Sequence, residues 1–148
     1  MAANVHLRLD DGYKAIITTR GLTLIADEPP EDGGTNQGMK PTELLIASLA
    51  ACAAITAKMY AQRKGWPLTS VEIDADFEKI KARDYPAYQG ESDIIHEIKQ
   101  RIIFKGDLDA DQRARLLEIA GKCPVHRVLT SPNFLIEELL TEEEASGL

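Results

Sequence analysis

The sequence predicts a single α+β domain, in which strands occur in antiparallel runs and do not alternate with helices. Two observations carry this prediction. Residues 4–26 and 70–104 show the period-two hydrophobic pattern of strands, and a long uncharged helical segment lies between them. The length of 148 residues suits one domain, which we assign to residues 1–148. Hydrophobic residues make up 44% of the chain and charged residues 28%, which is typical of a globular protein and not of a disordered one.

Residues 4–26 are expected to form a three-stranded β-meander. Apolar residues alternate with polar ones at its start, and an Asp-Gly pair at 11–12 and an Arg-Gly pair at 20–21 are turn signals. Glycine favours such turns because it adopts the positive φ that a tight hairpin requires. The following residues, 27–40, contain two prolines and three glycines, so we expect a loop there.

Residues 41–64 predict a long central helix. Pro41 suits a first helical turn, and Gly65 marks the end. Every residue from 44 to 57 is apolar or small, and a helix that is hydrophobic on all sides is buried on all sides. This uncharged run is shorter than the roughly 18 residues of a membrane span, so we expect no membrane partner. Because a chain of this size can hardly surround such a helix, we expect a second subunit to supply part of its cover.

Residues 70–104 are expected to form a β-hairpin with an acidic outer face. One face of its second strand carries, in order, Ile94, His96, Ile98, Gln100, Ile102 and Phe104. Asp109 and Gln112 have the spacing of a capping box that begins two helices within 109–130. Residues 133–138 predict a last strand, followed by an acidic tail.

The charge of the chain excludes several classes of partner. The 17 basic and 24 acidic residues give a formal net charge of −7. An acidic chain lacks the basic face that nucleic-acid phosphates require, so no nucleic-acid partner is expected. The first dozen residues have no basic n-region and no apolar h-region, so we expect no signal peptide and a cytoplasmic location. No metal-site spacing or phosphate-binding glycine motif is present, so we expect neither a metal nor a cofactor.

The two cysteines are the first candidates for chemistry. Cys52 lies in the middle of the apolar helix, where a thiol is either a small core residue or a desolvated group that needs a cation nearby to react. Cys123 directly precedes Pro124 at the expected start of a helix, where free N–H groups favour the thiolate. From spacing alone, Cys123 is expected to be the more acidic thiol, the alternative being an inert cap residue.

Two further side chains are candidates to assist a thiol. Glu43 lies in the first turn of the apolar helix, where a carboxylate compensates the helix dipole. It precedes Cys52 by nine residues and cannot reach that thiol along its own helix, although a partner chain or a folded-back loop could bring them together. Arg20 is a candidate to activate a thiolate, the alternative being an ordinary surface arginine. His126, three residues after Cys123, either tunes that thiol or is solvated.

Three segments resemble motifs of the OsmC/Ohr family. Residues 38–52, GMKPTELLIASLAAC, resemble the start of the family's central helix, where a Pro-x-Glu-Leu turn leads to an Ala-rich stretch ending in cysteine. Residues 123–129, CPVHRVL, resemble its second cysteine motif, Cys-Pro-Val-x-x-x-Leu. Residues 58–68 resemble the end of the central helix in the OsmC-like branch. The resemblance covers nearly the whole chain and the order of its expected elements.

The resemblance implies an OsmC-like α+β fold, in which antiparallel sheets wrap around a long buried central helix in an intertwined homodimer. It also implies a thiol-dependent peroxidase that reduces small organic hydroperoxides in oxidative-stress defence. Cys52 would be the peroxidatic thiol, and Cys123 would convert its sulfenic acid into a disulfide that a dithiol reductant opens. This assignment reverses the order of the thiols expected from spacing, and it requires a cation that offsets the desolvation of Cys52.

The sequence departs from the family pattern at two positions. The catalytic glutamate of the Ohr and OsmC branches lies one position before Glu43, where this chain has Thr42, and one residue rotates a helical side chain by about 100°. Arg20 is the nearest counterpart of the family's thiolate-activating arginine, but its spacing to Cys52 differs. The alternative function is therefore an OsmC-like small-molecule binding or redox-inert protein without peroxidase activity.

Overall fold

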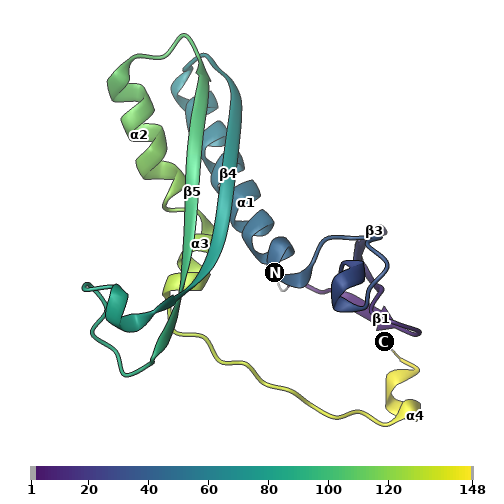
Figure 1. Cartoon of the computed structure of the whole chain (residues 1–148). Coiled ribbons are helices and arrows are strands. Elements are labelled where there is room, and N and C mark those ends of the chain that lie inside the picture. Colours follow the sequence, from purple (N-terminus) through teal and green to yellow (C-terminus); the bar gives the residue numbers. More distant parts are fainter. Residues whose placement is uncertain (1–2, 148) are drawn as a thin grey trace.

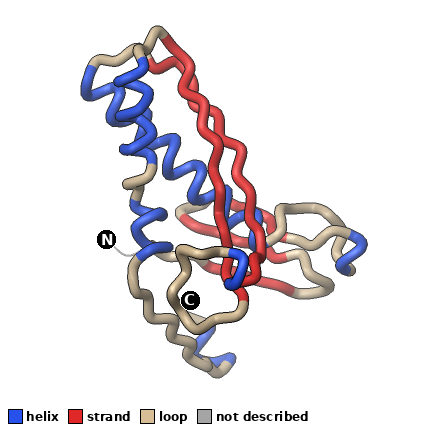
Figure 2. Tube along the Cα trace, turned by 60° about the vertical axis from the view of Figure 1, so that its left-hand side comes forward, coloured by secondary structure: helices blue, strands red, loops and turns tan. Residues whose placement is uncertain are grey.

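A long helix, α1 (Pro41–Lys64), forms the axis of the computed structural model, which describes residues 3–147. Beside it run the two strands of a long antiparallel hairpin, β4 (Leu68–Lys81) and β5 (Ile94–Gly106) (Figure 1). Figure 2 shows the main helices on one face of this hairpin, so the fold has two layers. The predicted α+β class is confirmed, and α1 has the predicted bounds.

The N-terminal meander is also confirmed. Its strands β1 (His6–Leu9), β2 (Ala15–Thr19) and β3 (Leu22–Ala26) pair antiparallel in sequence order. Only the two residues 20–21 join β2 to β3, and both have positive φ, 50° at Arg20 and 78° at Gly21. A two-residue turn with positive φ at both positions matches the twist of the flanking strands. Figure 1 shows this small sheet beside the N-terminal end of α1.

The loop between the meander and α1 is organised by one buried carboxylate. Asp27 is 1% exposed, and it accepts hydrogen bonds from the Thr35 hydroxyl and from the backbone N–H groups of Glu28, Thr35 and Gln37. The Thr35 hydroxyl and these N–H groups hold the pKa of Asp27 below its ordinary value despite burial. A short 3-10 turn, η1 (Pro30–Asp32), lies within this loop, which leads directly into α1.

Within one chain α1 is covered on one face only, which agrees with the expectation that a chain of this size does not surround the helix. Its buried residues recur every four positions, at Leu49, Ala53, Ala57 and Ala61. The opposite face leaves Ile55 59% and Met59 57% exposed. One hairpin and the following helices supply enough surface for one side of a helix, whereas the other side needs a further layer.

The helix α1 also meets the length and composition of a membrane span. An 18-residue window within it has a mean hydropathy of 1.7, and 22% of that window is buried. The uncharged run at residues 44–57 is bounded by Glu43 and Lys58 and is itself shorter than a span, whereas the whole helix is long and apolar enough. One such helix is weak support for a membrane location, since the core helix of a protein that spans no membrane meets the same criterion.

The core lies where α1, the hairpin and two shorter helices meet. These helices are α2 (Ala110–Ala120) and α3 (Pro124–Thr130), within the predicted range of 109–130. The predicted capping box begins α2, because Asp109 accepts the N–H of Gln112 at 2.7 Å and donates its own N–H to the Gln112 side chain at 2.9 Å. Small alanines on α1 allow close approach of the helices. The buried core comprises Leu49, Ala53, Ala57, Ala61, Leu68, Phe104, Leu108, Leu116, Ala120 and Cys123.

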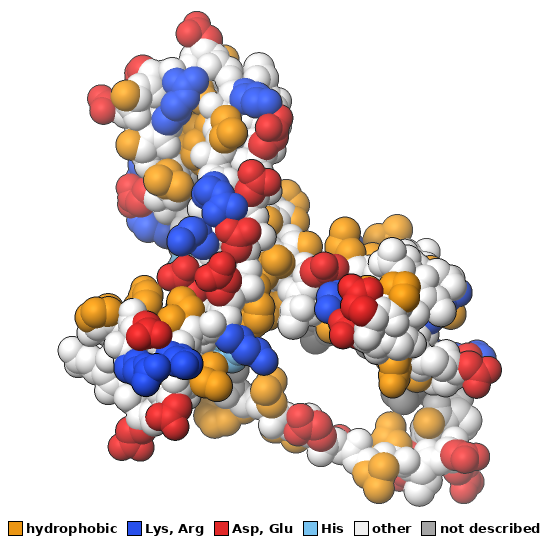
Figure 3. All heavy atoms as spheres, viewed as in Figure 1, with side chains coloured by type: hydrophobic (Ala, Val, Ile, Leu, Met, Phe, Trp, Pro, Cys, Tyr) orange, Lys and Arg blue, Asp and Glu red, His pale blue; other side chains and the backbone are white. Residues whose placement is uncertain are grey.

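The predicted last strand at 133–138 is absent. This segment pairs with no strand in the described chain, and its apolar side chains lie in solvent: Phe134 is 92% exposed, Leu135 85% and Ile136 81%. Figure 3 shows hydrophobic side chains along this thin arm. An apolar pattern creates a strand only where a sheet edge is available, and no such edge of the same chain lies against it. A one-turn helix, α4 (Glu142–Ala145), follows.

Candidate functional site: a pair of thiols

The fold brings the two cysteines together from distant parts of the sequence. Cys52 lies at the middle of α1, is half-buried and packs against the core cluster that contains Cys123. Cys123 immediately precedes α3, which packs on α1, and its side chain is completely buried. Both are free thiols. A pair of free thiols from two packed helices can form a disulfide reversibly.

Cys123 occupies the predicted helix N-cap, but its thiol is not acidic. The backbone N–H of His126 donates to the Cys123 sulfur at 3.3 Å, as expected at this position. Burial nevertheless raises the pKa of the Cys123 thiol, and the neighbouring Cys52 thiol raises it further through a hydrogen bond and its charge. These effects outweigh the N–H groups of His126 and Val125, which lower it. The expectation from spacing is therefore wrong, because a sequence position does not reveal how completely a thiol is desolvated.

Glu43 stabilises the start of α1 and does not reach the thiols within its own chain. Its carboxylate accepts the backbone N–H of Lys40 at 2.9 Å, and the side chain is exposed. Nine residues of helix separate it from Cys52, a rise of about 13 Å. The structure thus places Glu43 in its ordinary capping role.

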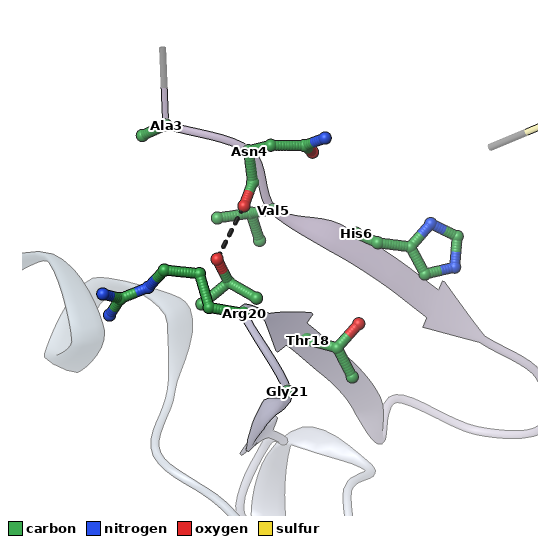
Figure 4. Close-up of a pocket in the computed structure, with 8 residues that line it drawn as sticks. Ala3, Asn4, Val5, His6, Thr18, Arg20 and Gly21 are labelled. Carbon is green, nitrogen blue, oxygen red and sulfur yellow. Dashed lines mark hydrogen bonds between the residues drawn. The ribbon is translucent and has the colours of Figure 1, made fainter. Parts of the chain in front are cut away.

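Arg20 is distant from Cys52 within one chain. It lies in the β2–β3 turn at the edge of a cavity of about 740 Å³ between β1 and β2. Figure 4 shows its guanidinium pointing away from His6 and Thr18. In residues 3–147 no carboxylate pairs with it. The small sheet lies beside the N-terminal end of α1, whereas Cys52 lies at its middle (Figure 1).

Sequence reasoning gave no role to Gln100, whose environment is unusual. Among residues 3–147, its side-chain oxygen is the buried polar atom that lacks a hydrogen-bond partner. The signal was present in the sequence, since Gln100 interrupts a face of isoleucines on β5.

For metals, no group of three or more His, Cys, Asp or Glu side chains within the described range gathers closely enough to hold an ion.

A two-layer α+β fold with a long central helix and a pair of thiols defines a known class of protein. The family model for OsmC-like proteins matches residues 34–137, and this chain belongs to that family. The match includes both cysteines.

Solved structures from three bacteria share the fold. An OsmC-like protein of Mycoplasma pneumoniae is 18% identical with a TM-score of 0.69, covering 87% of each chain. The organic hydroperoxide resistance protein OhrB of Bacillus subtilis is 22% identical with a TM-score of 0.59, covering 88% of this chain and 91% of its own. An organic hydroperoxide resistance protein OsmC of Legionella pneumophila is 18% identical with a TM-score of 0.62, covering 88% and 90%. No curated protein matches the sequence.

Proposed function

We propose that this chain is a thiol-dependent peroxidase that reduces organic hydroperoxides and serves in oxidative-stress defence. One observation carries the proposal: Cys52 and Cys123, distant in sequence, are neighbouring free thiols in a member of the OsmC-like family. Two structural relatives are described as organic hydroperoxide resistance proteins, which supports the substrate class.

Cys52 is the attacking thiol. It is half-buried and so within reach of a small substrate, whereas Cys123 is completely buried and its pKa is raised. The Cys52 thiolate attacks the terminal oxygen of R–O–O–H, the O–O bond breaks, and the alkoxide leaves and takes up a proton to give an alcohol. Cys52 is left as a sulfenic acid, Cys–S–OH.

Cys123 resolves this intermediate. Its sulfur attacks the sulfur of the Cys52 sulfenic acid, water leaves with the thiol proton, and a disulfide forms between the two residues. A dithiol reductant then opens the disulfide, restores two thiols and is itself oxidised to a disulfide. The cycle suits a cytoplasmic location, where reductants keep thiols reduced.

The working unit is a homodimer. The face of α1 that carries Ile55 and Met59 is apolar and open, and the arm at residues 133–140 holds apolar side chains in solvent. Burying one large aliphatic side chain contributes about 1.5–3 kcal/mol, so a second copy that covers both regions would gain substantially. Contact between the two α1 helices across this face would place the thiol sites at the subunit interface.

Within such a dimer Arg20 of one copy serves the thiol of the other. Arg20 adopts a φ of 50°, a conformation that costs a residue with a side chain about 1 kcal/mol relative to glycine. It has no carboxylate partner in the described chain, so its charge is available to stabilise a Cys52 thiolate. Glu43, now bound to the Lys40 N–H, would orient that guanidinium.

The test is turnover of cumene hydroperoxide with dithiothreitol as the reductant, and the measured quantity is the loss of the peroxide. We expect faster turnover with cumene hydroperoxide than with hydrogen peroxide, because the core around the thiols is aliphatic. Cys52→Ser should abolish turnover, and Cys123→Ser should allow a single reaction without cycling. Absence of turnover in the unmodified protein, or full turnover in Cys52→Ser, would contradict the mechanism and favour a binding or redox-inert role.

A further inference from the structure

The short helix α3 is fixed at each end by one side chain. At its start, the Cys123 sulfur accepts the backbone N–H of His126 at 3.3 Å. At its end, the Asn133 amide donates to the backbone oxygens of Val128 and Ser131, at 2.7 and 2.9 Å. None of the seven described residues of α3 is buried, so these end contacts carry much of its stability.

Packing against the core adds little to α3, which lies beside α1 (Figure 1). Of its described side chains, Val125 packs against the core cluster, whereas Val128 is 57% and Leu129 39% exposed. A helix of seven residues is too short to be stable alone in water, and segments with few buried contacts open first. The neighbouring α2, by contrast, buries Leu116 and Ala120. Beside the thiols, α3 is therefore the helix that opens most readily.

A disulfide between the two cysteines conflicts with the cap of α3. An S–S bond is about 2.0 Å long, shorter than any contact between separate thiols, so the two sulfur atoms must approach. Four buried residues anchor the long helix α1, so Cys123 makes most of this movement. As its sulfur moves toward Cys52, the His126 N–H loses its acceptor. The first turn of α3 has no acidic side chain to replace it, and loss of the cap destabilises the helix.

The burial of Cys123 explains why such an opening is useful. A reductant opens a disulfide by attacking one of its two sulfur atoms, which it must be able to reach. The Cys123 side chain is completely buried in the reduced protein. Cys52 is half-buried at the middle of α1, which does not open with α3. Opening of α3 would expose the second sulfur to a molecule larger than the peroxide.

We propose that disulfide formation opens the start of α3 and exposes the Cys123 sulfur, at which the dithiol reductant then attacks. The proposal rests on the peroxidase function and adds a conformational step between oxidation and reduction. One thiolate of the reductant bonds to the Cys123 sulfur, the bond to Cys52 breaks, and Cys52 leaves as a thiolate. The second thiol of the reductant then attacks the reductant's own sulfur in this mixed disulfide. Cys123 leaves, takes up a proton and caps α3 again.

Amide hydrogen exchange measures the opening of α3. The disulfide is formed with diamide, which oxidises paired thiols whether or not the protein is a peroxidase. We expect the amides of α3 to exchange about tenfold faster or more in the oxidised protein, while those of α1 are unchanged. Cys123→Ser is the matched control, because serine keeps a capping oxygen and cannot form the disulfide. Diamide should leave its α3 exchange as it is.

The point of attack is measured by trapping the mixed disulfide. Oxidised protein is treated briefly with mercaptoethanol, a monothiol that cannot complete the second step, and free thiols are then blocked with N-ethylmaleimide. Peptide mapping should find the mercaptoethanol adduct on Cys123 and the maleimide on Cys52.

The other end of α3 offers an independent variant. Asn133→Ala removes the two hydrogen bonds that fix the end of the helix, so α3 should open more readily. Reduction of the disulfide by dithiothreitol should become about fivefold faster, while the rate of Cys52 oxidation by cumene hydroperoxide is unchanged. A merely damaged protein would not gain speed in one half of the cycle.

The outcomes separate this proposal from the peroxidase function. Unchanged α3 exchange after disulfide formation, a mercaptoethanol adduct on Cys52, or unchanged reduction in Asn133→Ala would each overturn the opening and leave the peroxidase function intact. Failure of diamide to join Cys52 to Cys123 would refute both. Opening of α3 with diamide, but no oxidation by cumene hydroperoxide, would support the opening and refute the peroxidase function.

Discussion

The thiol of Cys52, on α1, lies beside that of Cys123, at the start of α3, and raises the pKa of Cys123. Burial raises this pKa more strongly still, and the N–H groups at the helix start do not compensate. The two thiols are therefore unequal: one is half-buried, whereas the other is desolvated and held in its protonated form at neutral pH. This inequality fits one attacking and one resolving cysteine.

The raised pKa of Cys123 predicts a pH dependence of stability. The folded state favours the neutral thiol. The contribution of this preference to the free energy of unfolding is therefore fully present below the ordinary thiol pKa of about 8.5. As pH rises from there through the higher pKa of the folded state, the unfolded chain ionises first and that contribution is lost. Thermal unfolding between pH 7 and 10 should show a decline in Tm that is weaker in Cys123→Ser. An equal decline in both proteins would contradict the raised pKa.

Arg20 offers a prediction in which stability and activity change in opposite directions. Replacing Arg20 by glycine relieves its positive φ of 50°, so the protein should gain up to about 1 kcal/mol in free energy of unfolding. The same change removes the proposed cation, and turnover of cumene hydroperoxide should fall by an order of magnitude or more. Denaturant unfolding and steady-state kinetics measure the two effects. Arg83→Gly, at an exposed arginine in the β4–β5 loop, is the control for loss of charge, and equal activities in the two variants would exclude Arg20 from the reaction.

The open face of α1 predicts the oligomeric state. Ile55→Glu places a charge on the proposed interface, and it should convert a dimer into a monomer in light scattering after size-exclusion chromatography. Leu117→Glu makes a comparable change on α2, where the leucine is 56% exposed, and should leave the dimer intact. If Ile55→Glu remains dimeric, or if the unmodified protein is monomeric, the proposed helix contact is wrong.

The core cluster predicts a contrast between two adjacent leucines on α2. Leu116 is completely buried, so Leu116→Ala should cost about 2–5 kcal/mol in free energy of unfolding. Leu117 is largely exposed, and Leu117→Ala should cost less than about 1 kcal/mol. Urea titrations of both variants measure the difference, and equal costs would show that α2 packs in another orientation.

The sequence predicted the elements whose signals are local. As expected, α1 begins at Pro41 and ends before Gly65. Gly65 has a φ of 67°, the left-handed conformation that ends many helices. The capping box of α2 and the turn at 20–21 likewise depend on neighbouring residues only. The family motifs added the pairing of Cys52 with Cys123, which spacing alone could not supply.

Features that depend on the environment could not be predicted in this way. A strand at 133–138 requires a sheet edge, and its apolar pattern does not say which chain provides one. The pKa of Cys123 depends on burial by α1 and on the neighbouring thiol, whereas the sequence showed only the helix cap. Similarly, Gln100 was visible as a break in an apolar face, but its missing partner became apparent only from the packing around it.

The most direct measurement of the central claim is the fate of the two thiols after addition of one equivalent of cumene hydroperoxide. The oxidised protein is digested without reduction and its peptides are identified by mass spectrometry. We expect an intrachain disulfide between Cys52 and Cys123, and a sulfenic acid at Cys52, trapped by dimedone, in the Cys123→Ser variant. Two unmodified thiols, or a sulfenic acid at Cys123 in place of Cys52, would contradict it.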